Sequence, residues 1–157
     1  MSERASAPMP RREALKRGSL LLALAACGLS AATFAAANEE EETAFNAPSL
    51  PEALAALGGT PATRAEIELD IPDLVENGAY VPVTVESRLP GTREIFIVVE
   101  SNPNPLVARF TIPDGTEPFI ATRIKMAESC NVYAVVRAGG RLYSAFRPTQ
   151  VMLGGCG

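Results

Sequence analysis

The sequence predicts an all-β fold, an antiparallel immunoglobulin-like β-sandwich that is preceded by a short N-terminal helix and followed by a flexible C-terminal arm. Short runs rich in β-branched and aromatic residues recur at close intervals after residue 65. Turn-forming Asn, Pro, Asp and Gly residues separate these runs, and no helical periodicity lies between them. Apolar residues make up 47% of the 157 residues, which favours one packed domain.

Residues 1–37 have the composition of an export signal. A basic segment precedes an uncharged stretch, rich in leucine and alanine, from Gly18 to about Ala37. The positions that match a twin-arginine signal are Arg11, Arg12, Leu15 and Lys16. Because this signal directs folded proteins out of the cytoplasm, we expect the protein to lie in the periplasm.

The signal is expected to be cleaved after Ala37, since Ala35-Ala36-Ala37 fits the small-residue requirement of a signal peptidase. Two alternatives stay open. The sequence Leu24-Ala25-Ala26-Cys27 also resembles a lipoprotein cleavage box, which would make Cys27 a lipidated N-terminus. The apolar stretch could also be retained as a membrane anchor, although an anchor needs about 20 strongly apolar residues.

The charge of the cleaved chain argues against two kinds of partner. Loss of residues 1–37 removes five basic and two acidic residues, which leaves nine basic and 16 acidic residues and a net charge of −7. Such a surface repels phosphate backbones and anionic lipids. We therefore expect no binding to nucleic acid or membrane.

The composition also excludes several chemical functions. The chain contains no histidine, the commonest general base, the usual partner of serine and cysteine nucleophiles, and the commonest zinc ligand. The expectation is therefore a protein that is not an enzyme and holds no metal. Tryptophan is absent and aromatic residues make up 6% of the chain, so a platform for stacking nucleic-acid bases is not expected either.

The body of the domain begins with an acidic stub, residues 38–48, and continues with a short helix. Ser49 is suited to cap the helix, Pro51 lies in its first turn, and the apolar residues that follow end at Leu57. Gly58 can adopt the left-handed conformation that ends a helix. The helix and the sandwich together are expected to span residues 49–153.

The first predicted strand, residues 66–71, alternates apolar and acidic side chains. Its three carboxylates, on Glu66, Glu68 and Asp70, could suggest a metal cluster, but alternate positions of a strand ordinarily form its solvated face. Further strands are predicted over residues 80–86, 94–100, 106–112, 119–125, 131–137, 141–146 and 150–153. The pairing of the strands between Val132 and Phe146 across Gly139-Gly140 is the clearest hairpin.

Two cysteines remain after the signal, and they occupy different settings. Cys130 lies at the start of a predicted strand, where a thiol usually packs as a small hydrophobic group. Cys156 lies between glycines, and the last residues, Gly154, Gly155, Cys156 and Gly157, form the predicted arm. Glycine adds no side chain beside the sulfur and permits many backbone conformations. A disulfide, either from Cys130 to Cys156 or between two chains, is the alternative.

These residues resemble a known family, SoxY, the sulfur-carrying Y subunits of the SoxYZ complex of bacterial thiosulfate oxidation. The resemblance covers nearly all of the chain after the signal. Besides the twin-arginine signal and the terminal Gly-Gly-Cys-Gly, it rests on residues 76–85, 102–105 and 122–127. Family members often end in one more glycine, and they commonly carry another small residue near position 130, so the resemblance implies no role for Cys130.

The resemblance implies a carrier of thiosulfate-oxidation intermediates that has no catalytic residue and no bound cofactor. Thiosulfonate and persulfide sulfur would be attached covalently to Cys156 while other proteins act on them. These would be a haem enzyme like SoxAX, a sulfate hydrolase like SoxB and a sulfur dehydrogenase like SoxCD. A heterodimer with a SoxZ-like subunit, which is exported together with this chain, is also implied.

The residues alone are also compatible with two other functions. The chain could be a secreted structural or adhesion domain that uses Cys156 only for a disulfide-linked dimer. It could also be a thiol peroxidase or a disulfide-exchange enzyme, but it lacks a Cys-x-x-Cys pair and any basic residue next to Cys156 in the sequence.

Overall fold

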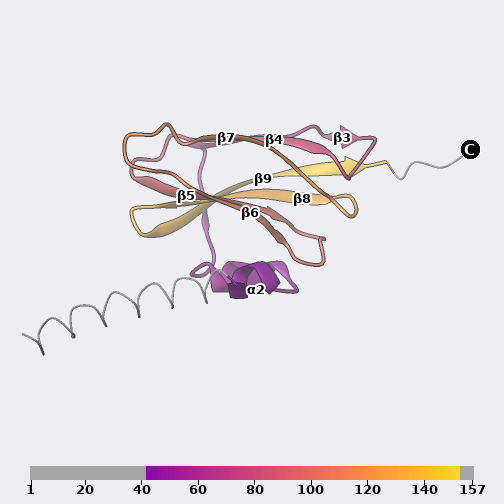
Figure 1. Ribbon diagram of the computed structural model, residues 1–157, viewed down its shortest axis with the longest axis horizontal. Coiled ribbons are helices and arrows are strands. Elements are labelled where there is room, and N and C mark those ends of the chain that lie inside the picture. Colours follow the sequence, from indigo (N-terminus) through magenta and orange to yellow (C-terminus); the bar gives the residue numbers. More distant parts are fainter. Residues whose placement is uncertain (1–41, 153–157) are drawn as a thin grey trace, which may run out of the picture. The chain divides into compact units, whose positions relative to one another are not determined.

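The predicted β-sandwich with a short N-terminal helix is confirmed in a computed structural model, which describes residues 42–152 (Figure 1). The described elements are α2 (Leu50–Ala56), β1 (Ala62–Thr63), β2 (Ile67–Asp70), β3 (Leu74–Val75), β4 (Val81–Ser87), β5 (Thr92–Val99), β6 (Leu106–Thr111), β7 (Phe119–Ile124), β8 (Cys130–Ala138) and β9 (Arg141–Val151). Residues 42–46 are also helical. Within this part of the chain, no helix has the length and apolarity needed to span a membrane.

Helix α2 begins and ends as its sequence predicts. Ser49 is extended and its side chain accepts a hydrogen bond from the Glu52 N–H, as an N-cap does. At the other end, Gly58 has a φ of 115°, and the N–H groups of Gly58 and Gly59 donate to the carbonyls of Ala55 and Leu54. This is a Schellman motif, which satisfies carbonyls that the helix leaves unpaired.

The two sheets enclose the main core. The larger sheet has the order β1-β9-β8-β5-β6, with β3 also paired to β9, and the smaller sheet has the order β2-β4-β7. Strand β4 is buried at every second residue, including Val81, Val83 and Val85, so these side chains point into the sandwich. They pack against Ile95, Ile97 and other residues of the larger sheet.

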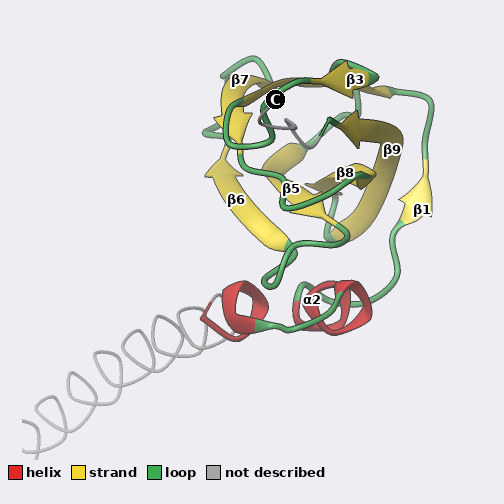
Figure 2. Ribbon diagram, turned by 90° about the vertical axis from the view of Figure 1, so that its right-hand side faces the viewer, coloured by secondary structure: helices red, strands yellow, loops and turns green. Residues whose placement is uncertain are grey.

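A helical layer covers the other face of the larger sheet (Figure 2). Phe96 and Val98 of β5 pack in a second cluster with Leu57 and with Ala44 of the helical residues 42–46. Both faces of β5 are therefore buried, which explains why its residues from Ile95 to Val99 form an unbroken apolar run. The acidic stub expected over residues 38–48 thus contains a short helical segment, packed on the sheet through Ala44, that the sequence did not predict.

The two strands predicted over residues 141–146 and 150–153 form one strand, β9, which continues through Pro148. The backbone groups of Ser144, Gln150 and Met152 bond toward β1 and β3. Pro148 lies an even number of residues from all three, so the position of its missing N–H points to the same edge of β9. Pro148 falls between the residues of β9 that pair with β1 and those that pair with β3, where that edge has no partner strand. Proline therefore removes no ladder hydrogen bond here.

Two pairings are parallel, although an antiparallel sandwich was expected throughout. Strands β1 and β3 each pair in parallel with β9. Each of these strands has two residues, which is too short for an alternating pattern to predict. The predicted hairpin is confirmed: β8 and β9 pair from Cys130–Thr149 to Ala138–Arg141, and Gly139 and Gly140 in the turn both have positive φ.

Candidate functional site

The sequence-predicted site residues at both ends of the chain lie outside the described residues. These are Cys156 and the arm residues Gly154, Gly155 and Gly157, and the signal residues Arg11, Arg12, Leu15 and Lys16 together with Cys27 and the cleavage site. The structure does describe the residues that precede the arm. We call Gln150, Val151 and Met152 the arm root.

The arm root is hydrogen-bonded to β3 on one side. The Gln150 N–H donates to the Asp73 carbonyl, and the Met152 N–H donates to the Val75 carbonyl, both at 2.8 Å. These hydrogen bonds therefore hold the end of β9 as far as Met152, the last described residue. Met152 itself is 48% exposed, so the chain reaches the surface here, four residues before Cys156.

On the other side of β9, the hydroxyl of Ser129, the residue before β8, bonds to the backbone of Val151. The Ser129 hydroxyl accepts a hydrogen bond from the Val151 N–H at 2.9 Å, and the same oxygen lies 3.4 Å from the Val151 carbonyl oxygen, to which it can donate. Val151 is thus bonded to Ser129 and is also paired in register with Val75. The arm root is held from both edges of β9.

Gly78 packs against the arm root where a side chain would not fit. A Cβ on Gly78 would lie well inside van der Waals contact with the Met126 carbonyl oxygen and 3.0 Å from Cγ1 of Val151. Gly78 does not have a positive φ, so close approach explains the glycine. The Met126 N–H donates to the Gly78 carbonyl at 2.7 Å, and the Asn77 side chain accepts from the Ala79 N–H.

Asn102 fixes the loop that faces Gly78. Its side-chain amide donates to the Lys125 carbonyl at 2.8 Å and accepts from the Ala127 N–H at 2.9 Å. The structure therefore brings together parts of the segments 76–85, 102–105 and 122–127, which are far apart in the sequence. Strand periodicity could not predict this cluster, because its contacts join loops rather than strand faces.

Cys130 lies close to the arm root but belongs to the core. It is half-buried, packs against the main core cluster and pairs with Thr149 across the sheet. Its thiol is free within the described part of the chain. This agrees with the interpretation of Cys130 as a small packed side chain.

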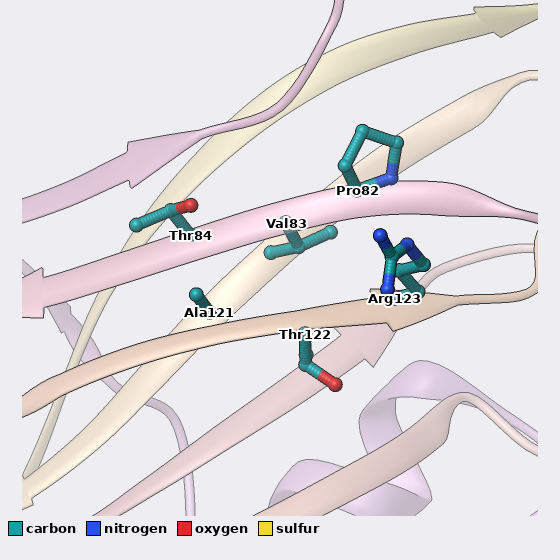
Figure 3. Close-up of a pocket in the computed structure, with 6 residues that line it drawn as sticks. All are labelled: Pro82, Val83, Thr84, Ala121, Thr122 and Arg123. Atoms are coloured by element: carbon teal, nitrogen blue, oxygen red, sulfur yellow. The ribbon is translucent and has the colours of Figure 1, made fainter.

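The outer face of the smaller sheet carries a shallow hollow, about 210 Å³ in volume, which we call the outer hollow (Figure 3). Its lining residues are Pro82, Val83, Thr84, Ala121, Thr122 and Arg123. The guanidinium carbon of Arg123 lies 4.7 Å from the ring centroid of Tyr80, which is 62% exposed.

The described residues offer few groups for acid–base or metal chemistry. Burial, and then the Glu100 carboxylate, raises the pKa of the Tyr133 phenol above its usual value, so this group keeps its proton near neutral pH. Tyr133 instead packs against Phe146, with 5.5 Å between ring centroids. No three acidic or cysteine side chains in residues 42–152 are grouped to hold a metal ion. Of the three carboxylates of the first predicted strand, that of Glu68 pairs with Arg88.

Comparisons with known proteins place the chain among sulfur oxidation proteins. A family model described as sulfur oxidation protein SoxY matches residues 53–156, a range that includes Cys156. The sulfur carrier protein SoxY from Chlorobium limicola f thiosulfatophilum has a similar structure, with 39% sequence identity and a TM-score of 0.61; the match covers 71% of this chain and 98% of that one. No curated protein matches.

A more distant match shows the fold alone. Superoxide reductase (neelaredoxin) from Ignicoccus hospitalis is 20% identical, with a TM-score of 0.50 over 59% of this chain and 95% of that one. At this identity the likeness concerns the arrangement of strands and says nothing of a shared chemistry.

Proposed function

Because the chain belongs to the SoxY family of sulfur oxidation proteins, we propose that it is a carrier that holds the sulfur intermediates of thiosulfate oxidation covalently on Cys156. The family match to residue 156 carries this proposal, since it extends through the arm to the thiol. The protein is a sulfur carrier rather than a catalyst. The absence of histidine from the sequence is consistent with a thiol that other proteins activate.

The arm root supports a presenting role for the arm. The hydrogen bonds to β3 and Ser129 fix the backbone as far as Met152, and Met152 is exposed. The four residues from Met152 to Cys156 span about 14 Å when extended. A thiol on such a tether can enter the active site of another protein while the sandwich stays outside it. Tethering also keeps each intermediate at a high effective concentration for the next step.

The proposed cycle has four steps. The Cys156 thiolate and thiosulfate form a sulfur–sulfur bond and lose two electrons to a haem partner, which gives a thiosulfonate. A hydrolase adds water, releases sulfate and leaves a persulfide. A sulfur dehydrogenase then oxidises the outer sulfur to a sulfonate with water as the oxygen source and removes six electrons. A second hydrolysis releases sulfate and restores the thiolate.

The cellular setting belongs to the same proposal. The family places the chain in the Sox system, and we propose a SoxZ-like subunit as its stable partner, with enzymes like SoxAX, SoxB and SoxCD as transient ones. The Arg11-Arg12 motif supports export by the twin-arginine route to the periplasm. Export in a folded state fits a subunit that carries its partner with it.

Intact mass and peptide mapping test the covalent role. The chain is purified without reductant, or incubated with thiosulfate and the partner enzymes, and then digested with trypsin. Because Arg147 precedes Pro148, the C-terminal peptide is expected to be residues 142–157, and Cys130 lies in a different peptide, residues 126–137. We expect thiosulfonate, persulfide or sulfonate mass additions on residues 142–157.

Matched variants make the result specific. Cys156→Ser should abolish the additions, whereas Cys130→Ser should keep them. Additions that persist in Cys156→Ser would disprove the assignment of the thiol. A chain recovered only as a disulfide-linked dimer through Cys156, inert to thiosulfate and the partner enzymes, would instead support a structural role for this cysteine.

A further inference from the structure

The outer face of the smaller sheet has an uneven distribution of charge. Of its acidic residues, Glu68 and Asp70 lie on β2, and Glu86 lies at the end of β4 that pairs with Phe119. Arg88 forms ion pairs with Glu68 and Glu86 there. At the opposite end, near the arm root, β7 and the residue that follows it carry the exposed cations Arg123 and Lys125, and the adjoining loops carry the exposed carboxylates of Glu76 and Glu128. None of the ion pairs within residues 42–152 involves Arg123.

Two contacts and a short stretch of chain connect Arg123 with the arm root. The Val151 side chain packs on Gly78, Gly78 is bonded to Met126, and Tyr80 follows Gly78 by two residues. Two residues span at most about 7 Å, and Tyr80 holds the Arg123 guanidinium over its ring. Arg123 lies beside Pro82 in the outer hollow (Figure 3). The hollow is therefore close to the arm root.

The arm can carry the thiol well beyond the arm root. The chain from Met152 to Cys156 reaches about 14 Å, and the cysteine side chain and its attached sulfur atoms add to that reach. The thiosulfonate and sulfonate forms of the proposed cargo are anions, whereas the free arm side chain is a neutral thiol when protonated. A guanidinium is the side chain best shaped to hold a sulfonate through paired N–H donors.

We propose that the loaded arm docks on its own domain, with the anionic end of the cargo on Cys156 bound by Arg123 in the outer hollow. This inference rests on the proposed covalent role of Cys156. Stacking on Tyr80 holds the Arg123 guanidinium in place, and Lys125, two residues further along, adds a second positive charge. A weak exposed site is sufficient because the tether supplies a high local concentration of its ligand. A partner enzyme takes the arm by displacing this contact.

The test loads the arm without any enzyme. The full chain carries Cys27→Ser and Cys130→Ala, which leaves Cys156 as the reacting thiol, and it is treated with tetrathionate. The thiolate attacks one of the two central sulfur atoms, a sulfur–sulfur bond forms to the cargo, and the bond between the central sulfurs breaks. Thiosulfate leaves with that electron pair, so no further oxidant is needed. A second sample is alkylated with iodoacetamide to give a neutral adduct at the same position.

Nuclear magnetic resonance reads the contact directly. We expect the Arg123 Nε–H and Tyr80 ring signals to shift with the thiosulfonate adduct and to remain unmoved with the neutral one. The shift should be lost near 1 M salt, where the screening length falls to about 3 Å. Arg123→Gln should abolish the Tyr80 shift, and Arg123→Lys should restore part of it. Arg141→Gln, at the distant β8–β9 turn, should leave it unchanged.

The outcomes separate the two levels of the proposal. If mass spectrometry shows the adduct on Cys156 but the Arg123 and Tyr80 signals do not move, self-docking is disproved and the carrier function stands. Equal shifts with charged and neutral adducts also disprove recognition of the anion. If Cys156 accepts no adduct from tetrathionate in the folded chain, the carrier proposal loses its reactive thiol, and the docking inference falls with it.

Discussion

Gly78 shows how a single residue can determine the position of the arm root. Its backbone touches both the Met126 carbonyl and the Val151 side chain, so it lies between the β7–β8 connection and the end of β9. Any side chain here must push apart two segments that are each fixed by hydrogen bonds. The role of Gly78 is therefore steric, in contrast to Gly115, which has a φ of 78° and open space around it.

Gly78→Ala is expected to lower the free energy of unfolding by roughly 1–3 kcal/mol, because the new methyl group overpacks the contact with Met126. Gly115→Ala is the matched control, since it tests a positive φ without a steric clash and should cost about 1 kcal/mol. Urea unfolding followed by circular dichroism measures both. The steric explanation fails if Gly78→Ala is no more destabilised than Gly115→Ala.

At the scale of elements, the strands that the sequence predicts well are those with a clear alternation. Strands β4 and β7 bury every second residue in whole or in part, and the hairpin of β8 and β9 has a Gly-Gly turn, so periodicity and turn chemistry locate them. Strand β5 is also found, although a strand buried on both faces gives no alternation, because turn residues flank its apolar run.

Other elements depend on contacts that no local pattern records. Residues 42–46 fall within the segment that the sequence predicts as an acidic stub, yet Ala44 is fully buried against the larger sheet. Strand β3 exists only because β9 continues past Pro148 and offers backbone groups to it. The same limit applies to the site: the glycine neighbours of Cys156 lead to the prediction of a carrier thiol, but the arm root depends on pairing between residues 73–75 and 150–152.

Ser129 allows the support of the arm root to be tested as a local property. Ser129→Ala removes the hydroxyl that accepts from the Val151 N–H, so amide exchange at Val151 should accelerate by roughly tenfold, the equivalent of about 1.4 kcal/mol. Hydrogen exchange measured by nuclear magnetic resonance gives the rates. The Met152 amide is an internal control, because it donates to Val75 and should change less. Equal acceleration at both amides would mean that β9 frays as a unit.

At the scale of the whole described domain, the larger sheet packs against another layer on each of its two faces. Its inner face forms the main core with the smaller sheet, and its outer face packs on the helices (Figure 2). This arrangement leaves the smaller sheet with one uncovered face, on which the outer hollow lies. The helical layer and the outer hollow are therefore on opposite sides of the sandwich, and the arm root lies at one end of it.

Glu94 connects the layers by charge. Its carboxylate, 12% exposed, accepts from Nε of Arg137 at 2.5 Å and from Nε of Arg109 at 2.8 Å. Arg137 also donates to the carbonyl of Leu57 at the end of helix α2, so one ion cluster joins β5, β6, β8 and the helix. Removing this carboxylate would take the negative charge away from between two partly buried guanidinium groups.

Glu94→Gln should therefore lower the free energy of unfolding by roughly 1–3 kcal/mol, less than a fully buried pair would lose because the arginines are 34% and 28% exposed. Glu68→Gln is the matched control. Its pair with Arg88 is about 60% exposed on both sides, so its loss should cost at most about 1 kcal/mol. Urea unfolding by far-ultraviolet circular dichroism compares them. Equal losses in the two variants would show that the Glu94 cluster is no stronger than a surface pair.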